Sequence, residues 1–238
     1  MIKKILGGIL LILLVVWPGH ASFLDSLKDT LGTVAPAKTD GGQVEKGLKE
    51  ALSIGAKNAV KYLGKNDGYF GNQAVKILLP EEVRQVDAVL RGAGFGPELD
   101  AFTLSMNRAA EKAAPLAADI FTQAVKDMSF DDANRILRGG NTAATDYLKG
   151  KTYDRLLALF EPSVRKTMDQ YKVTQQYNAI AGKVQNLPLV GKSLNLDVNR
   201  YVSAKALDGL FTMLAREETD IRTNPQARVT SLLKEVFK

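Results

Sequence analysis

The sequence predicts an all-α protein that folds as a single-domain helical bundle, with two long helices kinked at internal prolines. Three observations support this prediction. Apolar residues recur every three or four positions through most of the chain, which is the spacing of one face of a helix. Pro, Ser, Asp or Asn precedes several of these runs and Gly follows several, as expected at helix ends. The 238 residues, 45% of them hydrophobic, are enough for one substantial core.

The first 21 residues have the pattern of a secretory signal peptide. Lys3 and Lys4 form a basic start, residues 5–17 are an apolar run, and Gly19 and Ala21 are small residues suited to a cleavage site. The apolar run is shorter than the roughly 20 residues that a membrane span needs. We therefore expect cleavage after Ala21, a periplasmic location and no stable membrane span.

This cleavage would limit the chemistry of the mature protein. It removes the only histidine, His20, and the chain has no cysteine. A Ser-His-Asp or Cys-His catalytic group, a histidine-ligated zinc site and a Glu-x-x-His di-iron site are then excluded. We predict no catalytic residues of these kinds, no metal site and no cofactor.

The charge of the mature chain is mildly positive. Removal of the two lysines in the signal leaves 30 basic and 26 acidic residues, a formal charge of +4. These charges are scattered, which is typical of a solvated surface. An anionic small molecule or a component of the cell envelope fits this charge, whereas nucleic acid is not expected in that compartment.

Residues 22–43 are expected to form a flexible leader, because residues 32–42 are small, polar and rich in Gly. The folded all-α domain is expected to comprise residues 44–238. Within it, residues 65–72 are rich in turn-forming residues and residues 74–80 read as a short extended stretch. Helices are expected, in order, over residues 44–63, 80–91, 97–124, 130–138, 142–170, 174–184, 197–223 and 225–237.

The central Ala-rich helix, residues 97–124, is expected to pack closely against its neighbours. Its predicted core stripe is Phe102, Met106, Ala109, Ala113, Leu116, Ile120 and Ala124. Pro115 lies inside this helix, where it lacks an N–H donor and clashes with the preceding turn, so we expect a kink or short break there; Pro162 is expected to bend the helix over residues 142–170.

The turn at Gly139-Gly140 resembles a place where an anion could bind. Ser129 begins a capping-box-like sequence for the preceding helix. After the two glycines, Asn141 or Thr142 can cap the next helix through a side-chain oxygen. Free backbone N–H groups at such a helix start also hold anions, although two glycines between helices are a common connector.

Five stretches of the sequence resemble one uncharacterised bacterial family, the domain of unknown function 4197. They are ALSIGAKNAV from Ala51, LLPE from Leu78, MNRAAE from Met106, GGNTAATDY from Gly139 and the long block from Lys205 to Phe237. The resemblance covers about residue 44 to the end, and Lys238 departs from the expected Gly. It implies no activity, but it places Asn107, Arg108, Glu111, Thr142, Thr145, Arg222 and Arg228 at motif positions.

These observations predict an exported binding or structural module more readily than an enzyme. The candidate ligand-binding residues are Asn107, Arg108, Glu111, Arg138, Thr142, Thr145, Arg222 and Arg228. In this hypothesis the arginines and Glu111 converge with the Gly139-Gly140 turn on an anionic group, because a guanidinium binds carboxylate or phosphate through two hydrogen bonds. The competing interpretation is that each arginine caps a helix end or ties two helices together.

Two other functions remain open at this stage. A carboxylate-dependent hydrolase of the cell envelope would use Glu111 as its acid and needs a second carboxylate within roughly 5 to 10 Å across an open cleft. A carrier of an apolar ligand would need a dry elongated cavity between the Ala-rich helices. The adjacent Glu217 and Glu218 do not form a catalytic pair in this interpretation, since neighbouring helix positions point about 100° apart.

Overall fold

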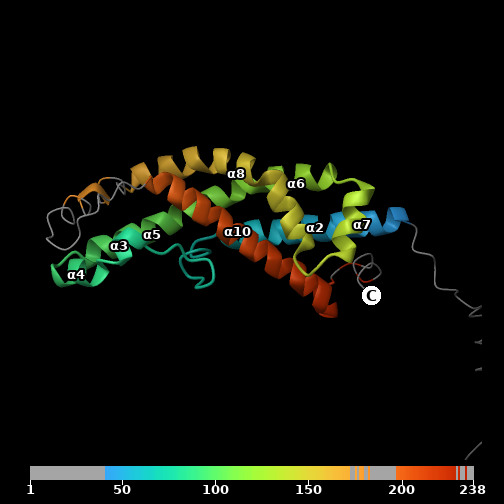
Figure 1. Cartoon of the computed structure of the whole chain (residues 1–238), viewed down its shortest axis with the longest axis horizontal. Coiled ribbons are helices and arrows are strands. Elements are labelled where there is room, and N and C mark those ends of the chain that lie inside the picture. The colour runs from blue at the N-terminus through green and yellow to red at the C-terminus, as the bar shows by residue number, and fades with distance from the viewer. Residues whose placement is uncertain are drawn as a thin grey trace, which may run out of the picture. The chain divides into compact units, whose positions relative to one another are not determined.

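Amphipathic helices form most of the described structure, which is a computed structural model covering residues 41–171, 175, 177–179, 182, 197–228, 230 and 234. No strand occurs among these residues, and the all-α prediction is confirmed (Figure 1). The predicted signal peptide and nearly all of the predicted leader lie outside the described residues, as do most of residues 172–196 and 229–238.

Short connections join most of the described helices, but residues 64–80 form a longer segment and most of residues 172–196 lie outside the described residues. In chain order the elements are α2 (Gly41–Leu63), α3 (Glu81–Arg84), α4 (Asp87–Gly92), α5 (Gly96–Ala113), the 3₁₀ turn η1 (Ala114–Leu116), α6 (Ala117–Lys126), α7 (Phe130–Arg138), α8 (Ala143–Gln170), α10 (Val198–Thr223) and the 3₁₀ turn η2 (Pro225–Ala227).

The predicted helix boundaries agree with the structure in some places and differ in others. The first helix begins at Gly41, three residues before the predicted start, so the end of the predicted leader is already helical. The helix predicted over residues 80–91 is two short helices, because the backbone of Val86 leaves the helical region with a φ of −113° and a ψ of 8°. The long helix predicted near the C-terminal end is present as α10, whose first turn Asp197 caps by accepting from the Arg200 N–H.

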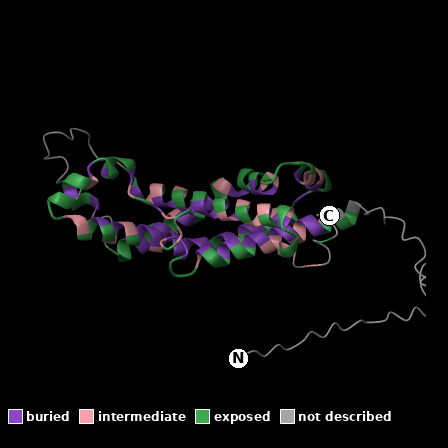
Figure 2. Ribbon diagram, turned by 90° about the horizontal axis from the view of Figure 1, so that it is seen from below, coloured by how far each residue is buried: buried purple, intermediate pink, exposed green. Residues whose placement is uncertain are grey.

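Residues 40–238 form one compact unit, and α10 contacts most of its other long helices. This helix packs against α8, α2 and α5, while α5 also packs against α8 and α2 against α6. The buried faces of these helices turn towards one another, as the purple stripes in Figure 2 show. Val202, Ala206 and Leu210 of α10 are fully buried, as one-face spacing predicts.

The predicted core stripe of the central helix is correct up to Pro115 and wrong immediately after it. Pro115 lies in η1, which separates α5 from α6. A 3₁₀ turn has three residues per turn instead of 3.6, so it rotates the following residues relative to the stripe. Leu116 is therefore 37% exposed, whereas Ala114 and Ala117 are fully buried in its place. The α8 helix continues through Pro162, and the predicted kinks at both prolines stay predictions.

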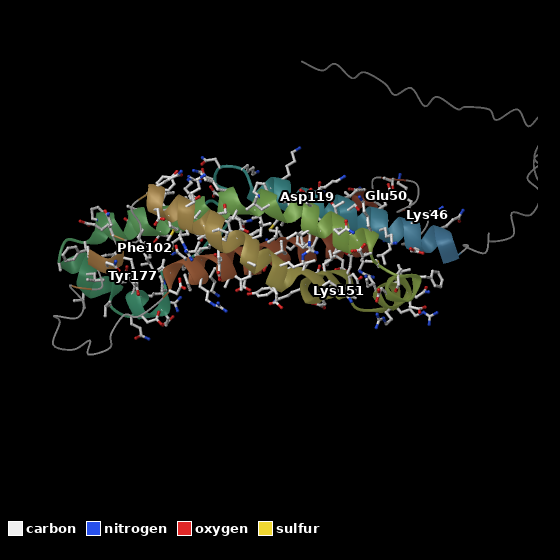
Figure 3. All side chains as sticks on the ribbon, turned by 90° about the horizontal axis from the view of Figure 1, so that it is seen from above. Lys46, Glu50, Phe102, Asp119, Lys151 and Tyr177 are labelled. Atoms are coloured by element: carbon white, nitrogen blue, oxygen red, sulfur yellow. The ribbon has the colours of Figure 1, made fainter. Side chains whose placement is uncertain are left out.

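Aromatic contacts extend the core towards the part of α5 nearest α4. Phe102, labelled in Figure 3, lies beside Tyr177, and their ring centroids are 5.8 Å apart. Phe121 of α6 meets Phe211 of α10 edge to face at 5.8 Å. In the part of the chain that the structure describes, every helix is too short or too polar to cross a membrane.

Candidate functional site

Glu111 of α5 is a buried carboxylate that binds the segment between α2 and α3. The residue is 4% exposed, and its Oε1 accepts hydrogen bonds from the backbone N–H groups of Tyr69 and Phe70, both at 3.1 Å. Its Oε2 accepts from Arg108 Nη1 at 2.6 Å. The helix brings Arg108 and Glu111 together because residues three apart share a face. Both oxygens of this carboxylate are thus used inside the protein.

The turn that Glu111 binds has an unusual backbone. Asp67 has a positive φ of 61°, a left-handed conformation that Asp tolerates better than most residues. Its carboxylate accepts from Arg108 Nη2 at 2.7 Å. Gly68 follows in a position where an added Cβ would lie 2.5 Å from the carbonyl oxygen of Leu63, so no larger residue fits. We call Asp67, Tyr69, Phe70, Arg108 and Glu111 the Glu111 cluster.

Asn107, one residue before Arg108, holds the same segment further along. Its Oδ1 accepts from the Ile77 N–H, and its Nδ2 donates to the Ile77 carbonyl, both at 2.8 Å. Nδ2 also donates to the Thr103 carbonyl within α5. The side-chain amide therefore pairs with Ile77 much as a neighbouring strand would. Full burial of Asn107 is compatible with this complete set of partners.

Tyr69 connects this segment to α10. Its hydroxyl donates to the Ala206 carbonyl at 2.6 Å, and the residue is fully buried. Burial, with the nearby Glu111 charge, raises the pKa of Tyr69 far above its usual value, so the phenol stays neutral. Gly209 makes the approach possible, because a Cβ there would lie 2.7 Å from the Tyr69 ring. The segment between α2 and α3, drawn in teal, accordingly lies beside α5 and α10 (Figure 1).

Glu218 of α10 forms a second buried cluster at the start of α8. Its Oε1 accepts from the Ala144 N–H at 2.9 Å, and its Oε2 accepts from the N–H and the hydroxyl of Thr145, both at 2.8 Å. Arg222, one turn later on α10, binds Oε1 at 2.9 Å and also donates to the Ile136 carbonyl at 2.9 Å. We call Ile136, Ala144, Thr145, Glu218 and Arg222 the Glu218 cluster.

The Glu218 cluster changes the interpretation of the Gly139-Gly140 turn. The N–H groups at the start of α8 do bind an anion, but the anion is the carboxylate of Glu218 in the same chain. The prediction that Asn141 or Thr142 caps this helix through its side chain is wrong. Thr142 holds the N-cap position without such a bond, and its hydroxyl donates to Asp146 at 3.2 Å instead. A carboxylate next to the helix N-terminus is the better acceptor, because it is charged.

The remaining predicted residues have separate positions. Arg228 donates to the carbonyls of Ile221 at 3.0 Å and Arg222 at 2.8 Å, which caps the C-terminus of α10. Arg138 is exposed on the last turn of α7. The eight predicted site residues thus divide between the Glu111 cluster with Asn107, the Glu218 cluster, the N-cap of α8 at Thr142, and the C-terminal ends of α7 and α10.

The structure adds Tyr69 and Glu218 to the residues that organise these clusters. A tyrosine within a turn-rich segment gives no local signal of a bond to a helix 137 residues away. Glu218 stands in the sequence next to Glu217. Its spacing of three residues before Ile221 places it on the buried face of α10, and this spacing could have indicated its role. That spacing marks it as a buried acid that needs partners.

A cleft of about 450 Å³ lies between residues 74–79 and α10, and we call it the α10 cleft. Glu81 and Arg84 of α3 line one part, and Tyr201, Lys205, Asp208, Gly209 and Thr212 of α10 line the other. Its size falls within the usual range of ligand pockets. Neither Glu111 nor Glu218 is among the residues that line it, although Asn107 and Tyr69 hold its wall in place.

Basic side chains are in slight excess around the α10 cleft. Arg84 pairs with Glu81, and Lys205 with Asp208 at 3.3 Å. Lys76 forms no ion pair with a described carboxylate, and its Nζ lies over the Phe70 ring at 4.1 Å. Burial raises the pKa of Tyr201, whose hydroxyl donates to the Leu78 carbonyl at 3.0 Å. The cleft therefore offers one lysine that makes no direct ion pair within the described residues, and the charge of this lysine, in addition to a hydrogen bond from Arg91, helps to lower the pKa of Asp100.

Two other observations bear on the alternative functions. The apolar hollow between α2 and α10, which reaches Glu218 and Arg222, holds about 10 Å³, roughly one water molecule. Within the described residues, no group of three or more Asp and Glu side chains is placed to hold a metal ion.

The sequence profile of one family, described as a protein of unknown function (DUF4197), matches residues 38–238. No curated protein and no solved structure matches the chain.

Proposed function

This chain belongs to the DUF4197 family of proteins of unknown function, and we propose that it is an exported binding module whose α10 cleft holds a ligand with an anionic group. The observation that carries the proposal is the pairing of an open cleft of ligand size with a lysine, Lys76, that forms no ion pair with a described carboxylate. Lys205 and Arg84 add positive charge at the same cleft. An anionic group there would gain charge-assisted hydrogen bonds from these side chains.

The proposal moves the anion site away from the Gly139-Gly140 turn. At that turn Glu218 already accepts from two backbone N–H groups, a hydroxyl and Arg222. An external anion would have to displace a carboxylate that is attached to the same fold. Within the described residues, no carboxylate is bound to Lys76 in the α10 cleft.

Binding has more support than hydrolysis or apolar transport. Glu111 is a poor general acid for an external substrate, because backbone N–H groups and Arg108 take both of its oxygens and it does not line the cleft. A carrier of an apolar ligand needs far more space than the hollow of about 10 Å³ beside α2 offers. Export is supported by the basic, apolar and small-residue pattern of residues 1–21.

Native mass spectrometry of protein exported to a bacterial periplasm tests the proposal. We expect a chain that begins at Ser22 and carries a retained anionic molecule. The Lys76→Glu/Lys205→Glu variant should lose that molecule through charge repulsion. The matched control is Lys61→Glu/Lys151→Glu, which changes the same charge at two exposed lysines outside the cleft, one of them labelled in Figure 3. Equal retention in both variants, or an empty wild-type protein, would contradict the proposal.

A further inference from the structure

The wall of the α10 cleft has the backbone geometry of a strand edge. Residues 76–78 follow a turn and alternate in exposure, because Ile77 is buried between half-buried Lys76 and Leu78, which is 50% exposed, as is typical of an extended chain. The N–H and the carbonyl of Ile77 both bind Asn107, so they point to the same side, towards α5. In an extended chain the polar groups of the adjacent residues point the opposite way. The Leu78 carbonyl confirms this direction, because it accepts from Tyr201 of α10.

Two backbone groups on the α10 side are open. The Lys76 N–H is bonded to the Asn72 carbonyl at 2.8 Å, and the Leu78 carbonyl is bonded to Tyr201. Neither the Lys76 carbonyl nor the Leu78 N–H has a hydrogen-bond partner in the described parts of the chain. These groups flank Ile77 on the side opposite Asn107. Together they can bind the carbonyl and the N–H of a single added residue.

We propose that the α10 cleft binds an extended acidic peptide segment of another protein, which adds alongside residues 76–78 as a parallel strand. The inference rests on the proposed function and names the class of its ligand. One peptide residue would donate its N–H to the Lys76 carbonyl and accept from the Leu78 N–H with its own carbonyl. This is the hydrogen-bond pattern of a parallel pair, and it would use the edge of residues 76–78 opposite the edge that Asn107 binds.

Hydrogen bonds that already exist within the protein favour a parallel over an antiparallel orientation of the peptide. An antiparallel pairing across Ile77 would also use the Lys76 N–H and the Leu78 carbonyl to complete its two exchanged pairs. Asn72 and Tyr201 already bind those two groups. A parallel residue opposite Ile77 needs neither of them.

The charge of the cleft selects the side chains of the peptide. Glu81 and Asp208 are each paired with a basic side chain, whereas Lys76 forms no close ion pair with a described carboxylate and can approach the ligand. An Asp or Glu next to the paired residue would reach this side of the cleft, since consecutive side chains in a strand project to opposite faces. The peptide therefore supplies both the backbone pair and the anionic group.

The test uses the full mature chain and an immobilised library of nine-residue peptides that each contain one Asp or Glu at varied positions. The tightest binder is then resynthesised with a single N-methyl group at each position in turn. We expect one position to weaken binding about tenfold, because one hydrogen bond is lost and the Lys76 carbonyl is left without its donor. Methylation of its two neighbours should change the dissociation constant by less than about threefold.

A pair of protein variants tests the other half of the contact. Leu78→Pro removes the N–H, which has no internal partner to lose, whereas Leu78→Ala keeps it. We expect Leu78→Pro to bind the peptide about tenfold more weakly than Leu78→Ala. If Leu78→Pro does not fold, as judged by circular dichroism, the N-methyl scan still decides, since it leaves the protein unchanged.

The inference is overturned if no library peptide binds, if every N-methyl position is tolerated, or if the two Leu78 variants bind equally. The proposed function has a separate outcome. Loss of the co-purifying molecule in Lys76→Glu/Lys205→Glu, together with failure of every peptide, would keep the anionic ligand and reject the strand. No effect of that charge reversal would reject the anionic ligand itself.

Discussion

The Glu111 and Glu218 clusters use the same chemistry for different purposes. In each, a buried glutamate accepts from two consecutive backbone N–H groups and pairs with an arginine on its own helix. Glu218 binds the first turn of a 28-residue helix, and the side chain of its partner Arg222 is 10% exposed. Glu111 binds a turn, and the side chain of Arg108 is 19% exposed and shared with Asp67.

This difference indicates what a substitution in each cluster would affect. The Glu218 cluster joins α10, α7 and α8, so a change there alters the packing of three helices. The Glu111 cluster, with Asn107, holds a segment whose outer residues line the α10 cleft. We therefore interpret Glu218 as a residue that stabilises the packing of the helices, and Glu111 as a residue that holds the wall of the α10 cleft in position.

The largest expected effect separates the two glutamates directly. Glu218→Ala should lower the free energy of unfolding by about 4 kcal/mol, because it removes the carboxylate partner of the buried Arg222 guanidinium and leaves two backbone N–H groups of α8 without their acceptor. Glu111→Ala should cost about 2 kcal/mol, since Arg108 keeps Asp67 and some solvent. Urea denaturation of both variants measures the difference. Equal losses would show that the two clusters contribute alike.

The next prediction tests how closely Tyr69 packs against α10. Gly209→Ala should cost about 2 kcal/mol through overpacking, because the new Cβ would lie 2.7 Å from the Tyr69 ring and 3.2 Å from Val75 Cβ. Gly55→Ala is the matched control within α2, where the nearest atom would be at 3.5 Å. There the same change should stabilise the protein by roughly 0.5–1 kcal/mol in urea denaturation. A stabilising Gly209→Ala would contradict the close packing.

The free energy of unfolding should fall at alkaline pH because of Tyr69 in the Glu111 cluster. The pKa of buried Tyr69 is raised, so the unfolded chain releases this proton above about pH 10 while the folded protein retains it. Stability is then fully present below pH 10 and falls as pH rises, by up to about 1.4 kcal/mol per pH unit for this group. Tyr69→Phe should lose stability less steeply between pH 9 and 11 in urea midpoints. Parallel slopes would place the alkaline loss elsewhere, for instance at Tyr201.

The smallest effects concern the arginines outside both clusters. Arg138→Ala should change the free energy of unfolding by less than about 0.5 kcal/mol, because the side chain is on the surface. Arg228→Ala should cost about 1 kcal/mol, since it leaves two carbonyls at the end of α10 without their donor. Thermal denaturation monitored by circular dichroism ranks the pair. A large loss for Arg138→Ala would require a partner outside the described residues.

Local patterns in the sequence account for the helices and several of their ends. The three- and four-residue spacing predicts α2, α5 and α10, and Ser129 with Asp132 forms the expected capping box. The prediction of Leu116 as a core residue fails because a single 3₁₀ turn shifts the phase of the helix. The prediction of a local cap for α8 fails because the cap comes from Glu218, more than 70 residues later. Helix patterns are local, whereas hydrogen bonds between helices depend on how those helices pack.

The sequence identified several of the residues in the buried clusters, but it did not predict which of them lie together in space. Asn107, Arg108 and Glu111 were identified as candidate residues. The predicted convergence of Glu111 and the arginines on the Gly139-Gly140 turn is not what the described residues show, because Arg108 and Glu111 bind a different segment from Arg222. The turn had an acceptor within the same chain, and the α10 cleft involves residues 74–79 and 201–212, which share no motif. Signal peptide, leader and periplasmic location remain predictions from residues 1–43.

The cap of α8 also has a consequence for how the chain folds. A chain is made from its N-terminus, so the first turn of α8 exists long before Glu218 does. Until α10 docks, the Ala144 and Thr145 N–H groups and the Tyr69 hydroxyl can form these hydrogen bonds only with water. Contacts at such sequence separations require closure of long loops and slow folding. We expect docking of α10 to be the late step that makes the domain cooperative.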